Sequence, residues 1–537
     1  MTSADTFANP VIPGFHPDPS ICRVGDTFYL VTSSFEYFPG IPIFTSTDLV
    51  SWTQIGHVLT RVSQVDLSGA PDSGGIFAPT IRHHDGTFYV TSTNVSGRGH
   101  FIVQATDPAG PWSDPVWVDQ NGIDPSLYFA DDEVYFTSNV EPDPSGPHLA
   151  EPDFERGIQQ SVVDPATGEV LVAPRFIWGG TGARYPEGPH LFRRGGYYYL
   201  LTAEGGTEYG HRVGVGRSTS PWGPFSASPY GPVVSHAGMT SAFQAMGHAD
   251  FVELADDEWW MVCLGVRPVG QWPRHLLGRE TFLARVRWTD DGWPRVGERG
   301  EVAAVQQRPG LPATGAEPPP VRDDFGADRL APCWQFVRRP LEPAVLHARR
   351  GLLALPTESR LDGPSPTFVG RRQQHHAFTA GARLRLEAAA EGDEAGIAVR
   401  MNGDHHYALG LRRAGAVNEI VLRIRLGRLD LVRTLGTTHG LAEVDVTVRG
   451  SVDSYVFSMV DDAGHEVAAP PVDAKFLSAE VAGGFTGVMV GMYAAGAGGG
   501  RGWFDWFDYT PLSSGGSVPR DDDERVIEPD RAVLTSP

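Results

Sequence analysis

Residues 18–29, DPSICRVGDTFY, are the first of five stretches built on the same pattern. Each begins with a small or polar residue, continues as a short apolar run, turns at Asp or Gly, and reaches a Tyr or Trp eleven positions after its first residue. The other four are APTIRHHDGTFY (78–89), DPSLYFADDEVY (124–135), EGPHLFRRGGYY (187–198) and HADFVELADDEW (248–259). Asp and Gly suit tight turns, and aromatic and β-branched residues favour strands. Each stretch is therefore predicted to be a β-hairpin.

The five stretches begin 46 to 63 residues apart, a spacing typical of propellers and other repeat arrays. A propeller arranges four-stranded blades around a central channel. Residues 1–305 are therefore predicted to form a five-bladed β-propeller that carries the active site. If the first residue of each stretch starts the innermost strand of its blade, these five residues face one central funnel. They are Asp18, Ala78, Asp124, Glu187 and His248.

The rest of the chain is predicted to contain a second β domain, so the fold class is all-β. Residues 306–320 are a Pro-rich linker, because the segment is extended and poor in core-forming residues. Residues 321–512 contain alternating runs such as VDVTVRGSVDSYVFSMV (444–460), which indicate a β-sandwich. Residues 513–537 are polar and charged and are predicted to be a flexible tail.

Composition and charge narrow the class of partner. The chain of 537 residues has a formal net charge of −22, which argues against nucleic acid, since phosphate binding needs a basic surface. We expect no membrane partner, because no apolar run is long enough to span a bilayer. The three cysteines are widely spaced and the N-terminus shows no secretory pattern, so we expect a cytoplasmic protein. Whether the chain forms a homo-oligomer stays open.

Three of the five first residues are carboxylates, Asp18, Asp124 and Glu187. Each is followed by Pro or Gly-Pro, which restricts the backbone at the start of the strand. A lone Asp-Pro is usually a turn, but three carboxylates at one repeat position indicate a shared site. Glycoside hydrolysis in its usual form needs two carboxyl groups, one protonated to donate to the leaving oxygen and one ionised. The pattern is consistent with that chemistry.

A run of motifs in this order carries a resemblance to a known family. HPDPS, FEYFPGIPIF, GGIFAPT, GIDPSL, YPEGPHL, TAEGGTEYGH, GHADFVE and LGRETFL resemble glycoside hydrolase family 43, and most of all its two-domain β-xylosidases and α-L-arabinofuranosidases. The resemblance implies an inverting hydrolase, and a sandwich domain of the jelly-roll, concanavalin-like kind. Asp18 matches the general base that activates water, and Glu187 matches the general acid. Asp124 matches the carboxylate that orients the acid and raises its pKa.

The resemblance also implies five substrate-binding residues besides the carboxylates, namely Phe35, Phe77, His248, Arg279 and Phe485. Arg279 matches an arginine that contacts sugar hydroxyls, Phe35 and Phe77 match aromatic walls of the pocket, and Phe485 matches a sandwich residue that closes it. The alternatives are a surface ion pair for Arg279, blade core for Phe35 and Phe77, and sandwich core for Phe485. Phe77 stands where relatives often carry Trp or Tyr. The segment of residues 269–277 is shorter than in many β-xylosidases, which could open the rim of the pocket.

His248 matches a histidine on the floor of the substrate pocket. A structural or hydrogen-bonding role is the first interpretation. A divalent-cation site, usually calcium, is the alternative, although calcium prefers oxygen ligands. No cofactor is required on the first interpretation.

The substrate expected is a short oligosaccharide. The first hypothesis is an exo-acting enzyme that removes terminal β-D-xylose from xylo-oligosaccharides. The second is an α-L-arabinofuranosidase, alone or combined with the first activity, because both sugars can present similar hydroxyl positions to one pocket. A hypothesis of another class is a non-catalytic sugar-binding propeller, which the presence of three carboxylates and Arg279 disfavours. A structural scaffold is a further alternative.

Overall fold

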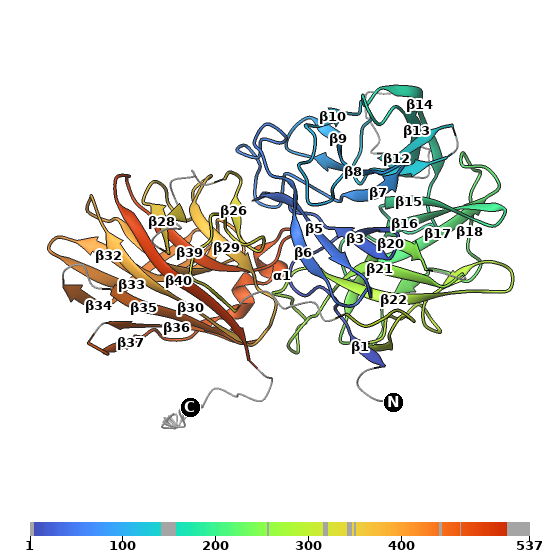
Figure 1. Cartoon of the computed structure of the whole chain (residues 1–537). Coiled ribbons are helices and arrows are strands. Elements are labelled where there is room, and N and C mark those ends of the chain that lie inside the picture. Colours follow the sequence, from blue (N-terminus) through green and yellow to red (C-terminus); the bar gives the residue numbers. More distant parts are fainter. Residues whose placement is uncertain are drawn as a thin grey trace, which may run out of the picture.

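The computed structural model describes residues 5–130, 132–140, 157–254, 257–314, 321–340, 346–347, 351–439, 443–461 and 463–512. Residues 315–320 of the predicted linker and the predicted tail, 513–537, lie outside the described residues. Figure 1 shows two bodies side by side, a propeller from blue to yellow-green and a sandwich from yellow to red. The predicted fold class, a five-bladed propeller followed by a concanavalin-like sandwich, is confirmed. None of the helices among the described residues has the length and apolar character needed to span a bilayer.

Each blade is an antiparallel sheet whose strands follow one another along the chain. Blade 1 consists of β2 (Ser20–Val24), β3 (Thr27–Val31), β5 (Gly40–Ser46) and β6 (Thr53–Leu59). Blade 2 consists of β7 (Thr80–His84), β8 (Thr87–Asn94), β9 (Gly99–Ala105) and β10 (Val116–Trp117). Blade 3 consists of β11 (Ser126–Phe129), β12 (Val134–Val140), β13 (Gly157–Val163) and β14 (Val170–Trp178). Blade 4 consists of β15 (Glu187–Arg194), β16 (Tyr197–Glu204), β17 (Arg212–Ser218) and β18 (Ser226–Ala227), with β19 (Val234–Ser235) also on β17. Blade 5 consists of β20 (Gln244–Glu253), β21 (Trp259–Val266), β22 (Glu280–Trp288) and β23 (Pro294–Arg295).

The repeated stretches form the inner hairpins of the blades. Their first strands, β2, β7, β11, β15 and β20, contact one another in a ring. Buried apolar residues fill the space between blades; Val31 and Ile43 of blade 1 pack with Val90 and Phe101 of blade 2. β1 (Thr6–Ala8), which precedes blade 1, pairs with β24 (Val305–Gln307), which follows blade 5. This pairing joins the first and last segments of the propeller. This ring places the first residue of every stretch around one axis.

The sandwich consists of two antiparallel sheets. One contains, in spatial order, β34 (Leu429–His439), β33 (Val417–Leu426), β32 (His405–Ala414), β31 (Glu394–Arg400), β39 (Met489–Ala495), β29 (Thr367–Arg372), β26 (Gln335–Val337) and β4 (Tyr37–Phe38). The other contains β27 (Leu346–His347), β28 (Leu352–Pro356), β40 (Arg501–Pro511), β30 (Phe378–Glu387), β35 (Glu443–Gly450), β36 (Ser454–Asp461) and β37 (Glu466–Ala468), with β25 (Arg322–Asp323) on β40 and β38 (Val472–Asp473) on β36. A 3₁₀ turn, η3 (Ala474–Leu477), and a short helix, α1 (Ala479–Ala482), precede β39.

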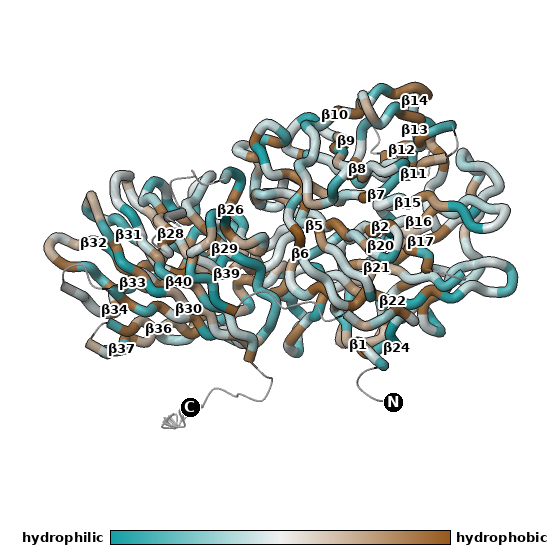
Figure 2. The backbone as a smooth tube through the Cα atoms, viewed as in Figure 1, coloured by the Kyte–Doolittle hydropathy of each residue, from teal (hydrophilic) through white to brown (hydrophobic). Residues whose placement is uncertain are grey.

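The sandwich core follows from the alternation of apolar residues along its strands. In β35, Val444, Val446 and Val448 are buried and the residues between them are partly exposed, as expected for a strand with one face on the core. Figure 2 shows hydrophobic and hydrophilic segments following one another along the strands of the sandwich.

The two domains share a sheet and an apolar interface. β4 belongs to the propeller segment FEYFPG but pairs with β26 of the sandwich, where Phe38 lies opposite Phe336. Beside this pairing, the propeller's Phe15 and Tyr37 pack against Phe368 and Tyr493 on the outer face of the eight-stranded sheet. The contact holds the segment between α1 and β39, which carries Phe485, against the propeller.

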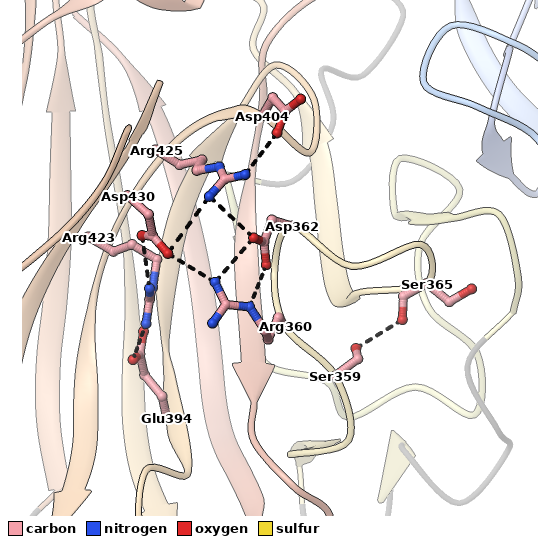
Figure 3. A network of polar contacts seen from close by, with 9 residues as sticks. All are labelled: Ser359, Arg360, Asp362, Ser365, Glu394, Asp404, Arg423, Arg425 and Asp430. Atoms are coloured by element: carbon pink, nitrogen blue, oxygen red, sulfur yellow. Dashed lines mark hydrogen bonds and ion pairs between the residues drawn. The ribbon is translucent and has the colours of Figure 1, made fainter. Parts of the chain in front are cut away.

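Another part of that outer face carries a network of ion pairs, shown in Figure 3. Arg423 lies 2.9 Å from Glu394 and 3.3 Å from Asp430, and Arg360 also contacts Asp430 at 2.9 Å. Burial opposes the charge of Arg423, but Glu394 outweighs it and raises the pKa of this arginine. The network joins β31, β33 and β34 and contributes no residue to the cavity described below.

Candidate active site

A cavity of about 800 Å³ lies where the five inner strands converge. Its lining includes the first residue of every repeated stretch: Asp18, Ala78, Asp124, Glu187 and His248. It also includes the other residues predicted to bind substrate: Phe35, Phe77, Arg279 and Phe485. The structure therefore brings every predicted site residue into one cavity, although these residues are up to 467 positions apart in the chain.

A shared backbone conformation turns these side chains toward the axis. Asp18, Asp124 and His248 have φ values of 56°, 56° and 44°, a left-handed conformation that residues with a side chain rarely adopt. In the Glu187 stretch, Gly188 takes the positive φ instead, at 54°. Strained backbone of this kind occurs where the surrounding structure holds a functional geometry.

Asp18 is a buried carboxylate with three polar neighbours. Arg279 donates from Nη1 to Oδ1 at 2.7 Å, Ser33 donates from its hydroxyl to Oδ2 at 2.5 Å, and His248 Nδ1 lies 3.7 Å from Oδ1. Burial disfavours ionisation, but the charge of Arg279 and the contacts of His248 and Ser33 outweigh it and hold the pKa of Asp18 below its ordinary value. Asp18 is thus ionised at neutral pH, as a general base must be.

Asp124 interacts with Glu187 and retains a proton. Burial, followed by the charges of Glu187 and Asp18, raises the pKa of Asp124 well above its ordinary value. The backbone N–H of Gly188 donates to Oδ2 of this carboxyl at 3.2 Å. Carboxyl groups that interact in this way titrate as a pair. A proton kept on this pair is the proton that a general acid at Glu187 needs.

Aromatic rings and Arg279 enclose the mouth of the cavity. The ring of Phe485, from the sandwich, lies 6.0 Å from the rings of both Phe35 and Phe77. Phe485 is 41% exposed, so it does not belong to the sandwich core. Arg279 is buried, bonded to Asp18, and donates to the carbonyl oxygen of Phe485 at 3.3 Å, so it is not a surface ion pair.

The histidines of the cavity floor are buried and held neutral. Burial is the main cause that lowers the pKa of both His248 and His211. The His248 ring lies on Gly188, where an added Cβ would come within 2.9 Å of the imidazole. His211 packs against Gly247 in the same way, and an added Cβ there would lie 2.0 Å from its ring. Gly188 and Gly247 therefore leave the space that the two histidine rings occupy.

The surroundings of His248 offer few protein ligands to a cation. Among the described residues, no group of three or more His, Cys, Asp or Glu side chains is placed to hold a metal ion. Calcium typically takes about six to eight oxygen ligands. The nearest carboxylate, Asp18, is already bonded to Arg279 and Ser33. A calcium ion beside His248 would need most of its ligands from water, so a cation at this place stays a prediction.

Several lining residues were not predicted from the sequence. Gln120 and Asn121 come from the connection between blades 2 and 3, and Thr207 and Glu208 come from a loop of blade 4. Ser33 follows β3 and reaches Asp18 from there. All lie outside the equivalent repeat position, so the repeat provides no signal for them.

Known proteins resemble this chain over most of its length. Residues 7–294 match the model of Glycosyl hydrolases family 43. The chain belongs to glycoside hydrolase family 43. Residues 322–510 match the Beta xylosidase C-terminal Concanavalin A-like domain. The two matches of this family 43 enzyme therefore cover its propeller and its sandwich. The predicted family and enzyme class are confirmed.

Named relatives of this family 43 chain carry two kinds of activity. It is 44% identical to the non-reducing end alpha-L-arabinofuranosidase BoGH43B of Bacteroides ovatus, over 94% of this chain and 95% of the relative. It is 36% identical to a xylosidase/arabinosidase of Butyrivibrio fibrisolvens, over 91% and 95% of the two chains. Its structure matches that of a xylan beta-1,4-xylosidase from Bacillus halodurans with a TM-score of 0.88 at 32% identity, over 94% of this chain and 100% of the other.

Proposed function

We propose that this enzyme is an exo-acting, inverting glycosidase that removes terminal α-L-arabinofuranosyl groups from the non-reducing ends of short oligosaccharides. The observation that supports it most is the joint placement of Asp18, Asp124, Glu187 and Arg279 in a cavity whose mouth carries Phe485. A cavity of about 800 Å³ with such a mouth suits the end of a chain rather than its middle.

The roles of the carboxyl groups follow from their surroundings. Asp18, ionised beside Arg279, takes a proton from the attacking water. Glu187 protonates the leaving oxygen, and Asp124 keeps a proton available to the pair. In inverting enzymes the base and the acid stand roughly 6.5–9.5 Å apart so that the water fits between the base and the sugar. The water attacks the anomeric carbon as the glycosidic bond breaks, and the product has the opposite configuration.

The order of substrates differs from the order that the sequence favoured. The first hypothesis from the sequence is β-D-xylosides, although the sequence motifs do not separate the two sugars. The relative that is 44% identical is named as an arabinofuranosidase, whereas relatives named as xylosidases alone are 34% identical or less in the curated comparison. We therefore place α-L-arabinofuranosides first. β-D-Xylosides are the second candidate, supported by the fit to a xylosidase structure with a TM-score of 0.88.

A direct test compares kcat/KM for 4-nitrophenyl α-L-arabinofuranoside and 4-nitrophenyl β-D-xylopyranoside, followed by arabinosylated xylo-oligosaccharides and xylobiose. We expect at least about a tenfold preference for the arabinosides, the size of discrimination that pocket contacts supply. A preference for both xylosides would reverse the order of substrates. Binding of either sugar without turnover would overturn the catalytic proposal in favour of a sugar-binding propeller.

Glu187→Gln provides the control for that alternative. Gln keeps the size of the side chain but cannot donate the proton, so turnover of oligosaccharides is expected to fall about 10²- to 10⁴-fold. Binding of the free pentose, measured by calorimetry, is expected to stay within about threefold. Equal turnover by variant and wild type would contradict the assignment of Glu187 as the acid.

A further inference from the structure

A hydrogen-bonded chain of residues runs from the domain interface to the ring over the pocket mouth. The backbone N–H of Phe485 donates to the hydroxyl of Ser73 at 2.9 Å. The backbone N–H of Ser73 in turn donates to Oε2 of Glu36 at 3.0 Å. Glu36 directly follows Phe35, whose ring forms the opposite wall of the pocket. Ser73 and Glu36 are both propeller residues, so the chain of contacts crosses from propeller to sandwich at Phe485.

We propose that Ser73, held by Glu36, is a positioning residue that fixes Phe485 over the pocket and thereby sets affinity for the terminal sugar. The inference rests on the proposed function in one respect, because it takes the sugar to lie beneath Phe485. It assigns no chemical step to Ser73, which is absent from the lining of the cavity.

Phe485 depends on backbone contacts because its ring is not packed in a core. The ring is 41% exposed, and its contacts are the two pocket rings and the guanidinium of Arg279. The N–H of Phe485 goes to Ser73, and its carbonyl oxygen accepts from Arg279. Arg279 also donates to Asp18, so it has a second role in the site. Ser73 has no other role there.

The segment that carries Ser73 is held tightly on both sides. Asp72, the preceding residue, accepts from Nη2 of Arg338 at 2.7 Å and from the backbone N–H of Gly403 at 2.9 Å, and both donors belong to the sandwich. Ile76, three residues after Ser73, exchanges backbone hydrogen bonds with Phe35 at 2.8 and 3.1 Å. The segment therefore connects the wall of the pocket to the domain that supplies Phe485.

Gly484, the residue before Phe485, packs closely against Ser73. Gly484 has a φ of +89°, and a Cβ added there would lie 2.4 Å from the Ser73 hydroxyl. On the other side of Ser73, Glu36 is fully buried, and its Oε1 has no hydrogen-bond partner among the described residues. Glu36 is therefore held in the buried interface, where it accepts the hydrogen bond from the Ser73 N–H. Loss of the Ser73 hydroxyl should affect the position of Phe485 most directly, because that hydroxyl binds the Phe485 N–H.

The test combines Ser73→Ala and Phe485→Ala in a double-mutant cycle. We expect Ser73→Ala to raise KM for the aryl arabinoside, and the dissociation constant of free arabinose, about fivefold, the factor expected for one hydrogen bond. The value of kcat should change less than twofold. In the Phe485→Ala background, Ser73→Ala should change neither constant by more than twofold, because the ring it positions is gone.

Ser96→Ala is the matched control. The Ser96 hydroxyl accepts from the N–H of Gly75 at 2.9 Å, so it holds the same segment without contacting Phe485. We expect its KM to stay within twofold of wild type. A fivefold effect of Ser73→Ala that persists without the Phe485 ring, or one that Ser96→Ala reproduces, would overturn the inference in favour of a structural role.

Hydrogen exchange supplies a readout that needs no substrate. In the intact protein, Ser73→Ala is expected to accelerate exchange of the Phe485 amide at least fivefold, and Ser96→Ala is not. An unchanged Phe485 amide would overturn the positioning role. If wild type neither binds nor cleaves pentosides, the proposed function fails, and the exchange rates still decide whether Ser73 holds Phe485.

Discussion

Replacing Arg279 by Met is expected to move the acidic limb of the kcat/KM profile upward by about two pH units. In the wild type, Arg279 lies 2.7 Å from Asp18 and both side chains are buried. Met has a similar length but no charge. Without the positive charge of Arg279, burial would raise the pKa of the Asp18 carboxyl. A base is active only when ionised, so a higher pKa makes activity fall at higher pH.

The size of the shift follows from the geometry. Removing one partner of a buried ion pair typically costs about 3–5 kcal/mol, and about 1.4 kcal/mol corresponds to one pKa unit. Ser33 and His248 stay in contact with Asp18 and offset part of that cost. About two units should therefore remain.

The assay is kcat/KM for an aryl arabinoside measured between pH 3.5 and 8. Arg98→Met is the matched control, because Arg98 lines the same cavity but its guanidinium lies over Trp117, 5.3 Å from the ring centroid. Its acidic limb should not move. A lower plateau for Arg279→Met with an unmoved limb would refute the reasoning, since Arg279 would then act on substrate alone and not on the charge of Asp18.

Three further predictions concern stability and metal dependence. Burial and then the charge of Asp72 raise the pKa of Glu36 from 4.5 to about 7, so the contribution of Glu36 to stability is fully present below about pH 4.5 and is lost as the pH rises through about 7. The side chain of Glu36→Gln stays neutral, so the free energy of unfolding of this variant in urea, relative to wild type, should rise by up to about 3 kcal/mol between pH 5 and pH 8. The same difference in free energy between variant and wild type at pH 5 and at pH 8 would contradict this. Leu384→Ala, in the sandwich core, should lower the free energy of unfolding of the sandwich by about 2–5 kcal/mol. Arg385→Ala, next along the strand and outside that core, should have a much smaller effect, and equal losses would argue against the buried face. Treatment with EDTA should change kcat/KM less than twofold, because the described side chains form no cation site; a large loss restored by calcium would contradict this.

The propeller could be predicted because its signal is local and repeated. Each hairpin needs only its own strands and turn, and five copies of one pattern determine the architecture. The carboxylates could be placed in one funnel by the same logic, since a residue at an equivalent repeat position lies at an equivalent place around the axis. Their left-handed backbone was not foreseen, because Asp and His do not signal a positive φ as Gly does.

The domain interface could not be predicted from local patterns. The segment FEYFPG reads as part of blade 1, yet β4 within it adds to a sandwich sheet. Phe485 was placed at the pocket only through the family resemblance, because nothing near it in the chain indicates a contact with Phe35, 450 positions away. Ser73 and Glu36 were missed for the same reason. Their roles arise from contacts between domains, and neither lies at the repeat position that the carboxylates share.

The measurement that tests the account most directly is the configuration of the first sugar released, followed by NMR during rapid hydrolysis of an α-L-arabinofuranoside. The account predicts β-L-arabinofuranose first, with the α form appearing only as the free sugar equilibrates. Initial release of α-L-arabinofuranose would mean retention of configuration, and it would contradict the assignment of Asp18 as a base that delivers water.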